Sequence, residues 1–294
     1  MTDWIDAIDW SAGARVDAEA EKEWMAMVKK GSPSVGEANV SIDEYHASER
    51  VSSSKLKTFM DLGPYAYYVR HVLRNNELKQ SDIMRLGQAF EDKVCGRKTF
   101  HVAEFDGRTK AGKAEKAAHQ DAIAEGLIWV SASHGEFMDR GHKHLVQNRA
   151  AMKLINSCSE QPTLYAPWRG LAGIQARPDW GNADGVFPDL KTTSTLEAFA
   201  RNLPRSHYHL QAAIVRMCAR HQGIRDTRHP LIVVEREWPY RCQVMELHED
   251  YLEIGESIVE RELTRMSECY RTEDFGLCEE KIVLSPPRWL AEKE

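Results

Sequence analysis

The spacing of hydrophobic residues changes near Thr163. Before that residue, apolar side chains recur every three or four positions, the spacing that buries one face of a helix. We therefore predict helices over 14–30, 51–60, 64–71, 86–94 and 133–155, and a basic loop that enters a helix over 105–116. In the last of these, Ser133 and Glu136 have the spacing of a capping box.

After Thr163 the apolar runs become short and β-compatible, and they are separated by turn residues. Strands are predicted over 164–168, 173–180, 186–193, 231–235 and 241–247. Because Gly181 to Gly185 is typical of a turn, the second and third of these strands are expected to pair as a hairpin. Two more helices are predicted, over 206–220 and over 248–271 with Tyr251, Ile254, Ile258 and Leu263 at core spacing. The fold class is α/β.

Charge is unevenly distributed along the 294 residues, whose formal net charge is −6. Residues 1–45 hold ten acids and four bases, so they are predicted to be an acidic leader and linker before a body at 46–294. Residues 50–120 hold fourteen bases and eight acids, which favours a nucleic-acid partner. The start of the chain lacks a signal peptide pattern and no apolar run could span a bilayer, so we expect a cytoplasmic protein without a membrane partner.

Six cysteines are scattered along the chain without paired spacing, and reduced thiols are expected in preference to an iron–sulfur cluster. His134, His142 and His144 do not align on one face of a helix, so solvated histidines are preferred to a second metal site. Trp180 is interpreted as a packing residue in preference to a wedge for nucleic-acid bases.

Candidate chemistry is concentrated around the turn at 181–185. Asp189 and Lys191 are two apart on a predicted strand and so face the same side, and the turn can bring Asp179 beside them. Crowded carboxylates repel one another unless a cation lies between them, and Mg²⁺ prefers such oxygen ligands. A surface salt bridge is the alternative for the Asp-x-Lys tripeptide alone; with the preceding Pro178-Asp179, the pattern indicates metal-assisted phosphodiester hydrolysis.

Pro178-Asp179 followed by Asp189-x-Lys191 resembles the signature of the PD-(D/E)XK nuclease superfamily. Further motifs, in chain order, resemble the exodeoxyribonuclease VIII family of phage recombination nucleases and the phage lambda exonuclease-like proteins. They are Ser52-Ser-Ser-Lys-Leu-Lys57, Leu86-Gly-Gln-Ala-Phe-Glu91, Phe105 to Lys113, Arg177-Pro-Asp-Trp180, Asp189-Leu-Lys-Thr-Thr193 and Tyr208-His-Leu-Gln-Ala-Ala213. The resemblance covers about residues 51 to 270. It implies a nuclease core with a central mixed sheet flanked by helices.

The resemblance also implies the site residues. Asp179, Asp189 and the backbone carbonyl of Leu190 would bind Mg²⁺, with Mn²⁺ as a possible substitute, and Lys191 would be the catalytic lysine. Gln211 matches the active-site glutamine of the family, with Tyr208 one helical turn before it on the same face. Glu91 stands where the exodeoxyribonuclease VIII pattern has histidine and lambda exonuclease has glutamate, so it is expected to bind metal.

Two further departures from the family pattern concern Asp189, which replaces the commoner glutamate, and Val215, where a tyrosine is frequent. DNA contacts are expected at Arg108, Lys110 and Lys113, in a glycine-containing loop whose alternative is a solvated surface. Ser54 and Lys55 match a region near the 5′ phosphate in lambda exonuclease; the alternative for Ser54 is a helix cap, and both roles use the start of a helix.

The activity implied by the resemblance is a Mg²⁺-dependent 5′ to 3′ exodeoxyribonuclease that degrades one strand at double-stranded DNA ends. Its expected partners are a single-strand annealing protein and further copies of itself in a ring, in phage or prophage recombination. One alternative is a single-strand-specific or helicase-associated nuclease. Another is a DNA-binding recombination scaffold without catalysis, against which the intact Asp179, Asp189 and Lys191 argue.

Overall fold

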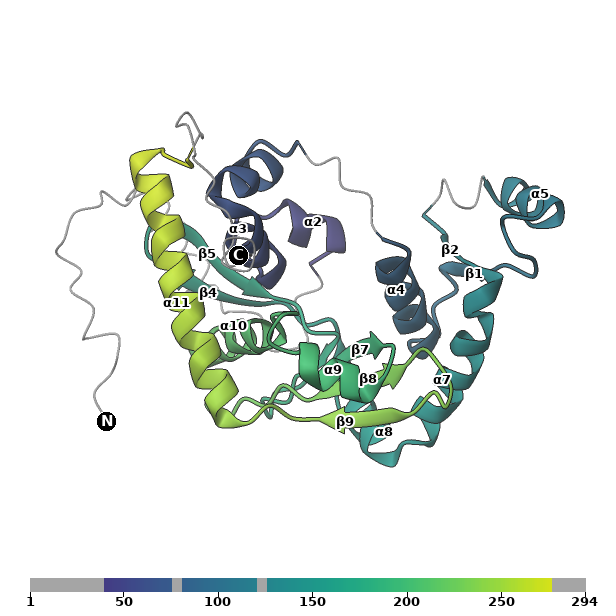
Figure 1. Cartoon of the computed structure of the whole chain (residues 1–294). Helices are drawn as coiled ribbons and strands as arrows, with labels where there is room; N and C mark the ends of the chain where they lie inside the picture. The colour runs from purple at the N-terminus through teal and green to yellow at the C-terminus, as the bar shows by residue number, and fades with distance from the viewer. Residues whose placement is uncertain (1–39, 76–80, 121–125, 277–294) are drawn as a thin grey trace, which may run out of the picture.

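The computed structural model describes residues 40–75, 81–120 and 126–276 (Figure 1). Their N-terminal part is helical, with α2 at Ile42–Ala47, α3 at Ser53–Tyr67 and a π-helical turn, η1, at Tyr68–Val72. Ser41 and Ser52 accept hydrogen bonds from backbone N–H groups of the first turns, which fixes where α2 and α3 begin. The helix predicted over 14–30 lies outside the described residues.

A kink divides α3 where the sequence predicts two helical stretches. Gly63 has a φ of 87°, a conformation that glycine adopts without a side-chain clash, and Pro64 follows it as the first residue of the second stretch. The predicted restart at Pro64 is therefore confirmed.

The middle of the chain forms a second helical group (Figure 1). Its elements are α4 at Asp82–Val94, β1 at Phe100–Val102, α5 at Lys110–Ala118, β2 at Ile128–Val130, a 3-10 turn η2 at Ala132–His134, α7 at Gly135–Gln147 and α8 at Arg149–Asn156. Strands β1 and β2 pair in parallel. Ser81 and Thr109 cap α4 and α5, respectively.

Strands and helices alternate in the last part of the chain. They are β3 at Ser159–Glu160, β4 at Leu164–Trp168, β5 at Leu171–Ala176, β6 at Trp180–Gly181, β7 at Asp189–Thr193, α9 at Leu196–Asn202, α10 at Tyr208–His221, β8 at Leu231–Glu235, β9 at Cys242–Met245 and α11 at Glu249–Thr272. Strand β7 pairs in parallel with β8, and β8 pairs antiparallel with β9. The parallel pair requires a long connection, which α9 and α10 supply.

Two large cores hold these elements together. One packs α3, α10 and α11 against the β4–β5 hairpin, and it includes Leu56, Ile174, Ile214 and Leu263. The other packs α4, α7 and α8 against β7–β9. Strand β8 is buried along its whole length because it lies between β7 and β9 with helices on both faces, which agrees with its unbroken Leu-Ile-Val-Val sequence.

The predicted hairpin between 173–180 and 186–193 is wrong in its pairing. The chain does reverse at the expected turn, where the Trp180 N–H donates to the Pro188 carbonyl over 3.1 Å and the Asn182 N–H donates to the Val186 carbonyl over 3.1 Å. Beyond the turn the segments separate, because β5 pairs with β4 and β7 pairs with β8. Turn chemistry predicted the reversal, but buried partners from elsewhere in the chain determine the sheet.

The single helix predicted over 133–155 is two helices. Asn148 has an extended backbone and accepts hydrogen bonds from the N–H groups of Ala150 and Ala151, so it ends α7 and caps α8. The predicted capping box is also wrong: Ser133 lies in η2, and its hydroxyl pairs with that of Ser131 over 2.9 Å.

The apolar face of α11 differs from the predicted one at its start. Tyr251 and Ile254 are exposed, whereas Gly255, Val259 and Leu263 are buried against α10 and its neighbours. The helix approaches α10 at Gly255, so the contact is centred on a glycine and not on the larger apolar residues before it.

The predicted α/β class is confirmed in coarse form. Across the described part of the chain the strands lie in four small sheets, of which β7–β8–β9 is mixed. Helices flank this sheet on both faces. No described helix has the length and apolar composition needed to cross a membrane.

Candidate active site

The turn at 182–185 places Asp179 against strand β7. Oδ2 of Asp179 accepts a hydrogen bond from the backbone N–H of Leu190 over 2.6 Å, so this carboxylate lies beside the segment that carries Asp189 and Lys191. Asn182 stabilises the reversal, since its side-chain oxygen accepts from the N–H groups of Asp184 and Val186. The predicted neighbourhood of the two aspartates is therefore present, although the strands around it differ.

Asp189 and Lys191 project from one face of β7 toward α10. The ammonium of Lys191 donates to Oδ2 of Asp189, whose side chain is almost completely buried. From α10, the Gln211 side-chain amide donates to Oδ1 of Asp189 over 3.0 Å, and the Tyr208 ring lies 5.2 Å from Nζ of Lys191. Gln211 and Tyr208 thus reach the same strand from one helix face, as their spacing predicts.

Glu91 reaches the cluster from α4, on the opposite side of the sheet from α10. Its Oε1 accepts a hydrogen bond from Gln161 and an ion-paired one from Arg97, each over 2.9 Å. Neither Arg97 nor Gln161 was singled out from the sequence. Arg97 follows Glu91 by six residues, just past the end of α4, and no local pattern indicates that its side chain returns to the helix.

Electrostatics connect these side chains across the site. Burial and, to a smaller extent, the negative charge of Glu91 raise the pKa of Asp179, Lys191 opposes the shift, and the net result is a pKa of about 7. Burial lowers the pKa of Lys191, and the charges of Asp179 and Glu91 oppose that change. Glu91 and Asp179 are therefore close enough to repel each other. The positive charges nearby do not fully offset the negative charges of these carboxylates.

A divalent cation would supply the missing charge, and the carboxylate oxygens of Glu91, Asp179 and Asp189 are the hard ligands that Mg²⁺ prefers. Among the described residues, no three acidic, histidine or cysteine side chains converge on one point. Each carboxylate has a protein partner: Arg97 and Gln161 for Glu91, Lys191 and Gln211 for Asp189, and the Leu190 N–H for Asp179. The oxygen donors are of the chemical type that Mg²⁺ prefers.

The predicted residues near the start of α3 have different positions. Ser54 is exposed at the first turn, next to Ser52, which is the residue that caps the helix. Lys55 is buried, and its amine donates to the backbone carbonyls of Ser48 and Arg50. In this arrangement Ser54 is accessible to a ligand, whereas the Lys55 amine is hydrogen-bonded to the backbone of the segment between α2 and α3.

The predicted basic residues around α5 lie apart from the catalytic cluster, on the lobe at the right of Figure 1. All three side chains are exposed. Arg108 pairs with Asp106 in the loop before the helix, over 2.6 Å. Lys110 and Lys113 lie in the first turn of α5, which Thr109 caps. These cations are available at the surface for a polyanion.

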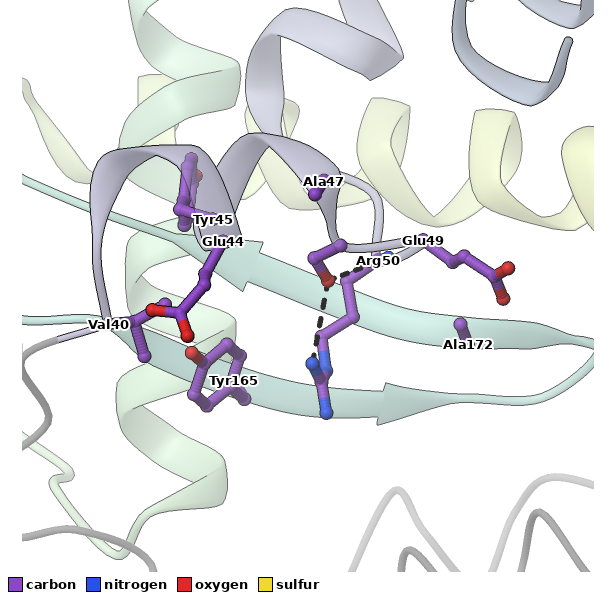
Figure 2. A pocket seen from close by; sticks show the side chains of 9 residues that line it. Val40, Glu44, Tyr45, Ala47, Glu49, Arg50, Tyr165 and Ala172 are labelled. Atoms are coloured by element: carbon purple, nitrogen blue, oxygen red, sulfur yellow. Dashed lines mark hydrogen bonds between the residues drawn. The ribbon is translucent and has the colours of Figure 1, made fainter. Parts of the chain in front are cut away.

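A pocket of about 740 Å³ lies between α2 and the β4–β5 hairpin (Figure 2). Its charged lining residues are Glu44, Glu49 and Arg50, and the Arg50 guanidinium lies 4.5 Å from the centre of the Tyr165 ring. None of the predicted site residues lines it. Because two acids face one base, the pocket does not favour a phosphodiester.

Comparisons with known proteins identify the family and the fold of the chain. A family model described as a PDDEXK-like domain of unknown function (DUF3799) matches residues 52–282, which is more than half of the chain. The matched range includes every residue of the cluster described above. No curated protein matches the chain.

Solved structures were also found to be similar. A candidate exonuclease from Eubacterium rectale is 14% identical, with a TM-score of 0.57 over 86% of this chain and 96% of that one. An alkaline exonuclease from Laribacter hongkongensis is 16% identical, with a TM-score of 0.30 over 62% of this chain and 95% of that one. The structure of that exonuclease in complex with dAMP is 15% identical, with a TM-score of 0.29 over 65% of this chain and 93% of that one. The Eubacterium rectale structure shows a shared fold.

Proposed function

The chain belongs to the PDDEXK-like family DUF3799, within the PD-(D/E)XK nuclease superfamily, and from this membership we propose that it is a metal-dependent nuclease that hydrolyses DNA. One observation carries the proposal: Asp179, Asp189 and Lys191, which match the superfamily motif, lie side by side in space through the Leu190 N–H and the Lys191–Asp189 pair. A surface salt bridge would not require a buried acid, a second, partly buried acid and a desolvated lysine.

The residues divide the chemistry among themselves. Glu91, Asp179 and Asp189, with the Leu190 carbonyl, would hold Mg²⁺, and Mn²⁺ as a substitute. A bound divalent cation supplies Lewis-acid polarisation of the phosphate and a more acidic water. Lys191 orients the attacking water and stabilises the charge that develops on the phosphate, since its ammonium is enclosed and directed by Asp189. Gln211 holds the Asp189 carboxylate in place by donating to Oδ1, the oxygen that does not pair with Lys191.

The substrate proposed is the end of a DNA duplex, degraded 5′ to 3′ with release of mononucleotides. The order of motifs from Ser52 to Gln211 supports this finer assignment, because it follows that of the exodeoxyribonuclease VIII family. A ring of identical subunits and a single-strand annealing partner, in phage or prophage recombination, belong to the same proposal. The exposed cations of α5 support a polyanionic substrate.

Digestion of a linear, 5′-phosphorylated duplex with Mg²⁺ tests the proposal. We expect loss of activity of at least about a hundredfold in Asp179→Ala and Lys191→Ala. Asp184→Ala is the matched control, since Asp184 is exposed on the same turn. A 5′ label released as mononucleotide before a 3′ label would support the polarity, and cleavage of a closed circular duplex would argue for an endonuclease. Equal activity in all variants would refute the assignment.

A further inference from the structure

Arg97 gathers three carboxylates at the edge of the catalytic cluster. Its Nε donates to Asp92 over 2.7 Å, its Nη1 to Glu160 over 2.6 Å and its Nη2 to Glu91 over 2.9 Å. Its backbone N–H also donates to the Asp92 carbonyl over 2.8 Å, which closes the end of α4. The residue is therefore held at four points, three of them through its guanidinium, and only one of its three partner residues is a predicted metal ligand.

The position of this guanidinium relates directly to the shortage of positive charge in the site. It places a positive charge against Glu91, one of the predicted metal ligands. Arg97 thus provides part of the compensation that a divalent cation would provide. It also occupies Oε1 of Glu91, the oxygen that accepts from Gln161 as well.

Asp92 and Glu160 keep Arg97 in place without Glu91. Asp92 is buried and binds the guanidinium from within α4, whereas Glu160 reaches it from β3. If Glu91 turned toward a metal ion, Arg97 would still have two carboxylate partners. The exchange at Glu91 would therefore not leave the half-buried arginine without a carboxylate partner.

We propose that Arg97 is a positioning residue that competes with the divalent cation for Glu91 and so sets the metal affinity of the site. This inference rests on the proposed function. Without metal, the guanidinium pairs with Glu91 and neutralises its charge. With metal, Glu91 exchanges Nη2 of Arg97 for the ion, while Asp92 and Glu160 retain the arginine.

A calorimetric titration of the full chain with Mn²⁺ or Ca²⁺ at pH 8.5, in the absence of DNA, tests this competition. We expect Arg97→Gln to bind the ion about tenfold more tightly than the wild type, because a neighbouring positive charge and a competing partner are both removed. Arg85→Gln is the matched control on α4, where Arg85 pairs with Asp82 at the surface, and its affinity should equal that of the wild type.

A double-mutant cycle with Glu91→Gln separates competition from a general effect of charge or folding. The increase in metal affinity caused by Arg97→Gln should largely disappear when Glu91 is also replaced by glutamine. Arg97→Lys keeps the charge but loses the three-way geometry, so its affinity should lie between those of the wild type and Arg97→Gln. Circular dichroism and thermal unfolding report whether each variant folds.

The outcomes distinguish this inference from the proposed function. A wild type that binds metal and cleaves DNA, with equal or weaker metal binding in Arg97→Gln and Arg97→Lys, would overturn the competition alone. A gain of the same size with and without Glu91 would overturn it as well. A wild type that neither binds metal nor cleaves DNA would remove both proposals.

Discussion

The side-chain amide of Gln211 donates a hydrogen bond to Oδ1 of Asp189, with 3.0 Å between the two heavy atoms. This contact joins the middle of the site to α10, which in turn packs on the β4–β5 hairpin and on α11. The orientation of a predicted metal ligand thus depends on how two cores pack against each other. The following predictions test this arrangement and its surroundings.

Replacing Gln211 by alanine should lower nuclease activity by about ten- to a hundredfold with little loss of stability, since it frees Asp189 to rotate without opening a large cavity. Initial rates on a 5′-labelled linear duplex, with thermal unfolding in parallel, provide the measurement. Gln222→Ala, at the far end of the same helix, should leave the rate unchanged. A Gln211→Ala variant with full activity would show that the hydrogen bond has no part in catalysis.

Asp179→Asn should stabilise the metal-free protein at pH 8 by about 1–3 kcal/mol but not at pH 4. The folded-state pKa of about 7 lies above the ordinary value of 3.8, so the native state binds more protons than the unfolded state between these values. Wild-type stability therefore falls as pH rises through this window. Asparagine keeps an oxygen for the Leu190 N–H and has no charge to bury.

Urea unfolding in the presence of EDTA at the two pH values measures this difference. Asp184→Asn, on the exposed turn, should follow the wild type at both. An Asp179→Asn effect of equal size at pH 4 and pH 8 would contradict the assignment of a raised pKa to this carboxyl group.

Lys55→Met should lower the free energy of unfolding by about 1–3 kcal/mol, because two part-buried backbone carbonyls lose their donor. The salt dependence of DNA binding should not change, since the buried amine is not available to phosphate. Lys57→Met is the control: Lys57 is exposed two residues later, and its loss should not affect stability. A folded Lys55→Met variant with a reduced salt slope would instead support a direct phosphate contact.

Reversing the charges of Lys110 and Lys113 to glutamate should weaken binding to duplex DNA about tenfold or more at low salt. The slope of log affinity against log salt should fall by about 2, because two phosphate contacts are lost. Fluorescence anisotropy with Ca²⁺ in place of Mg²⁺ measures both quantities without cleavage. Lys153→Glu, exposed on α8, is the comparison; an equal effect from that variant would show that only net charge matters.

Gly255→Ala should destabilise the protein by about 2–4 kcal/mol, because the new methyl group would lie 2.6 Å from the His209 carbonyl oxygen and 3.1 Å from Cβ of Ala213. Helix α11 must then move away from α10, which carries Gln211. Chemical denaturation measures the loss, and Gly107→Ala, with no atom within 4 Å of its new methyl group, is the control. Unchanged stability would mean that the two helices separate at no cost.

Much of the local structure could be predicted from the sequence, because it depends on neighbouring residues. The unbroken apolar run Leu231 to Val234 lies in strand β8, and the pattern over 206–220 is α10 to within two residues. The spacing of Pro178-Asp179 and Asp189-x-Lys191 predicted that these side chains lie close together, since a turn followed by a strand can bring them to one place. The family match over 52–282 agrees with that interpretation.

Only the tertiary structure decided the partners of these elements. Strand β7 pairs with β8 and not with the strand before the turn, because burial between two helical layers favours a parallel neighbour about 40 residues later over a local hairpin. The Arg97 side chain turns back onto Glu91, and the Lys55 amine is enclosed by carbonyls, through contacts that no periodicity encodes. Sequence patterns record which face of an element is apolar; which charges meet depends on the packing of faces that lie far apart in the chain.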